Sequence, residues 1–315
     1  MTTSLFPQEV YLLERYSSNE YFALMRDAWE AMVRHADDCL EQFTSKLPAD
    51  YRSRALPDQP DIVWGQRVIP NFRDTLHDLY ESYISLSHGH VNSLNTAHRV
   101  ANDFRGQLEF SSEWFDELEP KQGDKHSELL LIAVGYAGNI WRTAGAYWIK
   151  GALTVRYDPA SRGPINGPST WPKYQLNHLV TVRTGDPVPQ TGVYLPLIDD
   201  SCAQLLIAGD AADEASVGYD EHTMQNISSE PTNWTLVERV PDETVKDGLL
   251  DLLSGQTARV NRVPAGDPCP RSGWWYSPAQ ARSHRKFKQG DVFPGFEGSQ
   301  YGATFWLWSQ DQLDR

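Results

Sequence analysis

The chain has 315 residues, of which 40% are hydrophobic and 22% are charged, and this composition excludes an intrinsically disordered protein. Its formal net charge of −14 argues against direct binding of nucleic acid, because phosphate contacts need a basic surface. Three widely spaced cysteines indicate neither a disulfide framework nor a cysteine zinc site.

The start of the chain has neither a basic segment nor a long apolar run, which is unlike a secretory signal. No run of apolar residues is long enough to span a bilayer. We therefore expect a cytoplasmic protein that makes no contact with membranes.

The first half of the chain, residues 8–150, has the periodicity of helices. Ser18 or Asn19 can cap a long helix that ends before Pro48. Further helices are expected from about Pro70 to Leu86, Asn92 to Leu108, and Lys125 to Lys150. The last is the most apolar, but its Arg142 and Lys150 favour a buried bundle helix over a membrane span.

The segment from Arg156 to Tyr174 is crowded with Pro and Gly, which is typical of a linker. Beyond it, short β-type runs follow: His178–Val182, Gly192–Leu197, Gln204–Ala208, Trp234–Val240, Gly273–Tyr276 and Ala303–Trp308. One short helix is expected between Asp242 and Leu253. The sequence thus predicts an α+β protein, with a helical bundle domain (1–158) followed by a β-rich domain (159–315).

Two stretches of the β-rich half repeat the pattern G-D-P-x-P-x-[S/T]-G-x-[W/Y], 81 residues apart, beginning at Gly185 and at Gly266. The glycines accept positive φ and the prolines fix φ, so the shared frame indicates a duplicated structural unit. The second copy is shorter after its turns, and Trp234 would match Trp306. We expect two related units, at about 179–240 and 257–309, with a structural role for the motif.

No residue pattern predicts a catalytic, cofactor or metal site. His88, His90 and His98 are close in the sequence, but no cysteine lies near them and Gly89 reads as a helix break. Asp186 and Asp267 each lie between Gly and Pro, where a turn role is sufficient. Nucleotide-binding, nucleophile-elbow and metalloprotease motifs are absent from the sequence.

The negative charge is concentrated between the two repeat motifs. Residues 199–251 contain thirteen acidic and two basic residues, whereas residues 257–315 contain eight basic and five acidic ones. Such a run can be a solvated loop that keeps the protein soluble, or an interface. The part from Gly209 to Glu230 is also the insertion that the second unit lacks. The candidate partner-binding residues are Asp210, Asp213, Glu214, Tyr219, Asp220, Glu221 and Trp234.

Several stretches are similar to immunity protein families seventy-one and seventy-two. They are Arg262–Trp275, Arg285–Pro294, Tyr301–Trp308, Ile62–Gly65 with Pro70–Arg73, and Leu86–Gly89. The resemblance implies a bacterial antitoxin that binds and blocks a polymorphic toxin. Such a toxin is commonly the C-terminal domain of an Rhs-type effector delivered by type VI secretion. The resemblance implies no catalytic residues.

We therefore expect a non-enzymatic immunity protein that occludes the active site of a cognate toxin, a basic nuclease being one such partner. An acidic inhibitor suits a basic enzyme because opposite charges accelerate their encounter. The alternative is an enzyme of unknown class with a small-molecule pocket between the helical and β halves.

Overall fold

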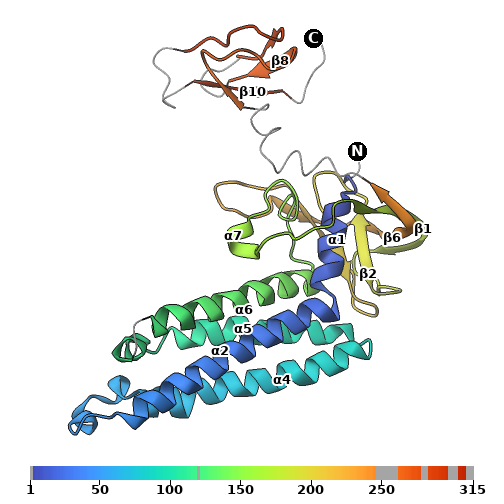
Figure 1. Ribbon diagram of the computed structural model, residues 1–315. Coiled ribbons are helices and arrows are strands. Elements are labelled where there is room, and N and C mark those ends of the chain that lie inside the picture. Colours follow the sequence, from blue (N-terminus) through green and yellow to red (C-terminus); the bar gives the residue numbers. More distant parts are fainter. Residues whose placement is uncertain (1–2, 119–120, 246–261, 278–282, 297–303, 310–315) are drawn as a thin grey trace. The chain divides into compact units, whose positions relative to one another are not determined.

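A computed structural model describes residues 3–118, 121–245, 262–277, 283–296 and 304–309 (Figure 1). The chain forms two compact units, Met1–Lys246 and Asp247–Arg315, which we call unit 1 and unit 2. Unit 1 combines helices with a four-stranded sheet, and unit 2 contains a second four-stranded sheet. The predicted α+β class is confirmed, with helices preceding strands along the chain.

The long helices of unit 1 are α1 (Pro7–Tyr16), α2 (Asn19–Ser45), α4 (Ile69–Ser87), α5 (Ala97–Gln107) and α6 (Gln122–Ala144). Short helical segments connect them: η1 (Tyr51–Ser53), η2 (Leu56–Asp58), α3 (Pro60–Val63), η3 (Trp64–Val68), η4 (Val91–Thr96), η5 (Glu113–Glu117) and α7 (Pro159–Arg162). The predicted start of α2 is confirmed, because the Ser18 hydroxyl accepts a hydrogen bond from the Tyr21 N–H at 3.2 Å.

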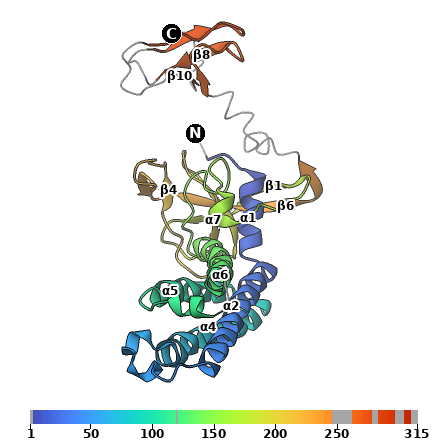
Figure 2. The same ribbon diagram turned by 60° about the vertical axis from the view of Figure 1, so that its left-hand side comes forward.

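Helices α2, α4, α5 and α6 pack together as a bundle (Figures 1 and 2). Its core contains Trp29, whose indole N–H donates to the carbonyl of Phe72 at 3.0 Å. Helix α6 ends before the predicted Lys150, because Ala146 adopts a φ of 52° that no helix continues. None of the described helices combines the length and apolar character needed to cross a bilayer.

The sheet of unit 1 consists of β1 (Trp171–Arg183), β2 (Gly192–Pro196), β3 (Gln204–Leu206) and β6 (Asn233–Val245). Its antiparallel order is β1-β6-β2-β3. Strand β1 begins at Trp171, inside the stretch that the sequence suggested as a linker. The helix expected between Asp242 and Leu253 is wrong over Asp242–Val245, which extends β6 and pairs with β1 at its end; the rest of that range lies outside the described residues.

Helix α1 joins the bundle to the sheet, and it packs against β1, β2 and β3 (Figures 1 and 2). The Gln204 side-chain amide also donates to the carbonyl of Trp148, beyond α6, at 2.6 Å. These contacts explain why the helical residues and the first sheet form one compact unit. The units therefore divide between residues 246 and 247, whereas the sequence suggested a division near residue 158.

Unit 2 repeats the sheet of unit 1. Its strands β7 (Arg262–Pro264), β8 (Gly273–Tyr276), β9 (Arg285–Phe287) and β10 (Phe305–Trp308) have the order β7-β10-β8-β9. The register also recurs, because Gly192 pairs with Leu206 in unit 1 and Gly273 with Phe287 in unit 2. The duplication predicted from the sequence thus extends to topology and register.

The two Gly-Asp-Pro turns have the same backbone geometry. Gly185 and Gly266 have φ values of 87° and 93°, which glycine adopts more readily than any other residue. One backbone hydrogen bond near the turn recurs in both units. The Val188 N–H donates to the carbonyl of Asp210 at 2.9 Å, and the equivalent Cys269 N–H donates to the carbonyl of Asp291 at 2.6 Å.

The cores of the two sheets correspond residue by residue. Trp234 and Trp306 are fully buried, and their indole N–H groups donate at 2.9 Å to the carbonyls of Asp213 and Pro294, respectively. The unit 2 core is the more aromatic: Trp275, Phe287, Phe293 and Trp308 stand where unit 1 has Tyr194, Leu206, Ala212 and Leu236.

Candidate functional site

The acidic stretch that the sequence singled out lies between the second turn of unit 1 and β6. Its centre is a two-stranded antiparallel hairpin of β4 (Ala215–Val217) and β5 (Ser228–Glu230). Asp213 and Trp234 are 21 residues apart, whereas their counterparts Pro294 and Trp306 are only 12 apart. Residues 210–230, called the acidic hairpin below, therefore contain nine residues more than the equivalent part of unit 2.

Asp220 organises the loop at the end of the acidic hairpin. Its carboxylate accepts hydrogen bonds from the His222 N–H at 2.9 Å and the Thr223 hydroxyl at 3.0 Å. Its own N–H donates to the carbonyl of Gln225 at 2.8 Å. The bond from the His222 N–H is the main reason why the pKa of Asp220 lies below its usual value. This candidate partner-binding residue therefore serves the loop itself.

Two large apolar side chains of this loop project into solvent. Met224 is 71% exposed and Ile227 is 69% exposed. Met224 has a φ of 56°, a left-handed conformation that costs a residue with a side chain roughly 1 kcal/mol or more. The bond from the Met224 N–H to the carbonyl of Asp220, 2.8 Å long, holds it there. Both side chains are therefore accessible to a binding partner.

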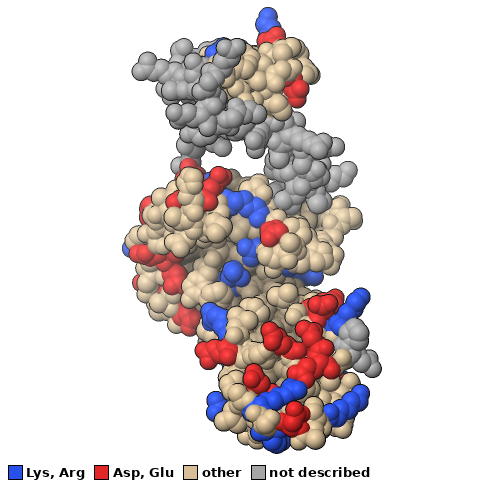
Figure 3. Space-filling model, turned by 90° about the vertical axis from the view of Figure 1, so that its left-hand side faces the viewer, with Lys and Arg blue, Asp and Glu red and all other residues tan. Residues whose placement is uncertain are grey.

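The carboxylates of Asp210, Asp213, Glu214 and Glu221 are exposed; Glu221 lies in this loop, whereas the other three precede β4 at the opposite end of the β4–β5 pair. Among the described residues, no ion pair involves any of them. Partial burial and the neighbouring charge of Asp210 raise the pKa of Asp213. A cation placed next to Asp210 and Asp213 would favour the ionised form of both carboxyl groups. On the face drawn in Figure 3, acidic side chains gather over both the sheet and the helical part of unit 1, with several basic ones between.

The two aromatic candidates do not belong to this exposed surface. Trp234 is 0% exposed, so its assignment as a partner-binding residue is wrong: it fills the core beneath the acidic hairpin. Tyr219 is half-buried, and the guanidinium of Arg156 lies 3.5 Å from the centre of its ring. Arg156 thus occupies a ring face that a partner would need.

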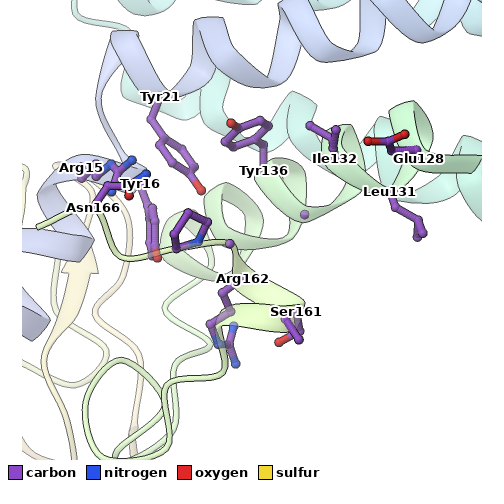
Figure 4. A pocket seen from close by; sticks show the side chains of 14 residues that line it. Arg15, Tyr16, Tyr21, Glu128, Leu131, Ile132, Tyr136, Ser161, Arg162 and Asn166 are labelled. Atoms are coloured by element: carbon purple, nitrogen blue, oxygen red, sulfur yellow. The ribbon is translucent and has the colours of Figure 1, made fainter. Parts of the chain in front are cut away.

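A separate cavity of about 370 Å³ lies in unit 1 between α1, α2, α6 and the segment from 160 to 166. In Figure 4 the rings of Tyr21 and Tyr136 lie together, and Ile132, Leu131 and Glu128 follow along α6. The two tyrosine rings meet edge to face with centroids 5.2 Å apart. No strand residue lines this cavity, so it differs from the expected pocket between the helical and β halves.

Two polar side chains of the cavity are bonded to residues just outside its lining, whereas the buried Nε of Arg162 has no hydrogen-bond partner among the described residues. The Tyr21 hydroxyl accepts a hydrogen bond from the Asn139 amide at 2.9 Å, and burial raises the pKa of Tyr21 to about 12. Arg15 donates to the carbonyl of Ile165 and its guanidinium lies over the Tyr21 ring. The cavity can hold an apolar group, but its lining residues include no nucleophile paired with a base.

In the described ranges, no group of three or more His, Cys, Asp or Glu is placed to hold a metal ion. Cys39, Cys202 and Cys269 are buried, and burial raises the pKa of the Cys39 thiol to about 11. A reactive thiolate is therefore disfavoured at Cys39.

A scan against protein-family models and searches of curated proteins and of solved structures each find no match for this chain.

Proposed function

We propose that this chain is a cytoplasmic immunity protein that binds a bacterial toxin and blocks its active site, with no catalytic activity of its own. The acidic hairpin carries this proposal, because its fixed loop holds Met224 and Ile227 in solvent and the same hairpin carries exposed carboxylates. The motifs that resemble immunity protein families seventy-one and seventy-two imply the same function, although no family model matches the chain.

The acidic hairpin combines the two features that a toxin inhibitor needs. Burying a Met or Ile side chain contributes about 1.5–3 kcal/mol, so the apolar pair would supply affinity. The exposed carboxylates of Asp213, Glu214 and Glu221 would speed association with a basic surface, such as the substrate-binding face of a nuclease.

Unit 2 shows that the sheet does not need the acidic hairpin for its own fold. The same strand order and the same buried tryptophan are present there with nine fewer residues between turn and strand. The nine additional residues of the acidic hairpin are therefore not needed for the sheet, and we assign them to binding.

The test is protection of a bacterial strain that expresses a toxic product of a gene next to that of this chain. Wild-type protein should restore growth, and Met224→Ser with Ile227→Ser should abolish protection at equal protein levels. The matched control is Leu56→Ser with Leu108→Ser, which removes apolar side chains that are 65% and 69% exposed elsewhere in unit 1. Loss of protection in the control alone, or in neither variant, would overturn the assignment of the acidic hairpin.

The cavity between α6 and the 160–166 segment favours a second candidate function, an enzyme that acts on a small molecule. Its volume of about 370 Å³ is in the range of ligand pockets. Replacing Gly135, which lines this cavity, with Trp would fill it. Unchanged protection in Gly135→Trp would separate this candidate from the immunity function.

A further inference from the structure

The cavity of unit 1 has a basic end and an acidic end. Its lining includes Arg15, Tyr21, Tyr136, Ile132 and Glu128, and Figure 4 shows these five side chains in a row. The rings of Tyr21 and Tyr136 meet edge to face, and Ile132 is 44% exposed. An apolar stretch thus lies between a guanidinium and a carboxylate.

Arg15 at the basic end has hydrogen-bonding capacity to spare. Its Nη1 donates to the carbonyl of Ile165, and its guanidinium lies 5.4 Å from the centre of the Tyr21 ring. Among the described residues, no ion pair involves Arg15. Because a guanidinium has five N–H groups, several of them can still donate to an anion.

A second guanidinium, that of Arg162, adds positive charge at the same end. Its buried Nε has no hydrogen-bond partner, and no ion pair involves Arg162 in the part of the chain that the structure describes. Asp158 acts on Arg162, but its exposed carboxylate accepts a hydrogen bond from the Ala160 N–H at 3.0 Å.

Tyr16 connects the two cations. Burial raises the pKa of Tyr16, and the charge of Arg15 opposes this rise. Burial lowers the pKa of Arg162, and Tyr16 opposes this fall. Both guanidiniums therefore act on the surroundings of one side chain that lines the cavity.

We propose that this cavity binds a small monocarboxylate with an aryl or alkyl body, its carboxylate at Arg15 and its body along Tyr136 and Ile132. A guanidinium fork matches the geometry of a carboxylate, and the aromatic and aliphatic lining suits an apolar body. Glu128 at the far end repels a second negative charge, which disfavours phosphates and dicarboxylates.

This site goes beyond the proposed immunity function and does not rest on it. None of the residues that line the cavity belongs to the acidic hairpin. Binding of the monocarboxylate involves no chemical step, so the proposal also differs from an enzyme. A loss of ligand binding with intact protection against the toxin would leave the immunity function standing.

The test is calorimetric titration of the full-length protein with phenylbutyrate, an aryl monocarboxylate. Binding should saturate at one ligand per chain and weaken with salt. The neutral amide, phenylbutyramide, should bind at least about fivefold more weakly, because its hydrogen bonds are not assisted by charge. Inorganic phosphate, which lacks the apolar body, should give no measurable binding. Absence of phenylbutyrate binding, or equal binding of the amide or of phosphate, would overturn the proposal.

Two variants place the ligand in this cavity. Arg15→Gln should weaken phenylbutyrate binding at least about fivefold. Its control is Arg67→Gln, which removes the same charge at an exposed position outside the cavity and should change the affinity less than about twofold. Gly135→Trp should abolish binding, because a Cβ at Gly135 would lie 4.0 Å from the carbonyl oxygen of Ser161 and the indole would fill the cavity.

Circular dichroism shows whether each variant keeps its helices. An undiminished affinity of either folded variant would overturn the proposal. The comparison of phenylbutyrate with its amide uses only the wild-type chain, so it decides the question of charge recognition even where a variant fails to fold.

Discussion

The carboxylate of Glu9 in α1 accepts a hydrogen bond from the backbone N–H of Ala203, 2.9 Å away, at the start of β3. Glu9 is fully buried, and this burial raises its pKa from 4.5 to about 7, although the Ala203 bond opposes the rise. The buried carboxyl group of Glu9 thus links α1 to the sheet of unit 1.

This acid should make the stability of unit 1 depend on pH. The pKa is higher in the folded than in the unfolded chain, so the folded state binds the proton more tightly. Stability should therefore fall as the pH rises from about 4.5 to about 7. Glu9→Gln should be more stable than wild type at pH 8, by up to about 3 kcal/mol, and similar to it near pH 4. Urea unfolding followed by circular dichroism measures the difference, and an equal pH dependence of both proteins would refute this role.

Trp234 and Trp306 should each stabilise the core of their own unit to a similar extent. Replacing either with Ala should cost about 3–5 kcal/mol, as for a large buried aromatic residue. Because unit 2 is a compact unit of its own, Trp306→Ala should remove the near-ultraviolet signal of unit 2 while the helical signal of unit 1 persists. Unfolding of the helices in Trp306→Ala would show that the units are not independent.

The repeated turn should tolerate only glycine at its first position. Gly266 has a φ of 93°, and a Cβ there would meet no atom within 4 Å, so Gly266→Ala tests backbone strain without a clash. We expect a loss of about 1–2 kcal/mol in the unfolding free energy of unit 2. Gly295→Ala is the control, because that glycine lacks a positive φ and has only an ordinary contact at 3.8 Å. Equal effects of the two substitutions would argue against strain.

The sequence predicted those parts of the fold that depend on local residue patterns. Gly185 and Gly266 predict the same turn, because few residue types adopt the positive φ that it requires. Ser18 predicts the start of α2, because its side chain caps the helix. The end of β6 was not predicted from the sequence. Pairing of Val245 with Trp171 of β1 overrides the helical preference expected for this acidic segment.

The acidic stretch was predicted as the candidate site, and its role in binding stays a prediction. The acidic run in the sequence coincides with the hairpin. Which of its side chains are accessible depends on burial, which the sequence pattern does not give. The match between Trp234 and Trp306 was itself a sign that Trp234 belongs to the shared scaffold. No residue pattern predicts that Met224 and Ile227 are exposed, and only the structure shows that the Asp220 loop holds them in solvent.

The exposed carboxylates should control how quickly the toxin is bound. Asp213→Lys with Glu214→Lys should slow association about tenfold at low salt and weaken its salt dependence, since such charges act mainly through steering. Glu41→Lys with Glu109→Lys makes the same change in net charge at exposed positions outside the acidic hairpin and should leave the rate within about twofold of wild type. Stopped-flow kinetics at two salt concentrations distinguish these outcomes. Unchanged rates in the hairpin variant would assign the acidic run to solubility.

The affinity of the full-length protein for the proposed toxin, taken from a neighbouring gene and inactivated by mutation, tests the central claim most directly. Calorimetry should show a stable complex with wild-type protein. Met224→Ser with Ile227→Ser should weaken this complex by about 2–4 kcal/mol, or about 30- to 1,000-fold, because two apolar side chains no longer leave water on binding. Absence of a complex with the wild-type chain would contradict the immunity function, and an undiminished affinity of the double variant would contradict the acidic hairpin as its binding surface.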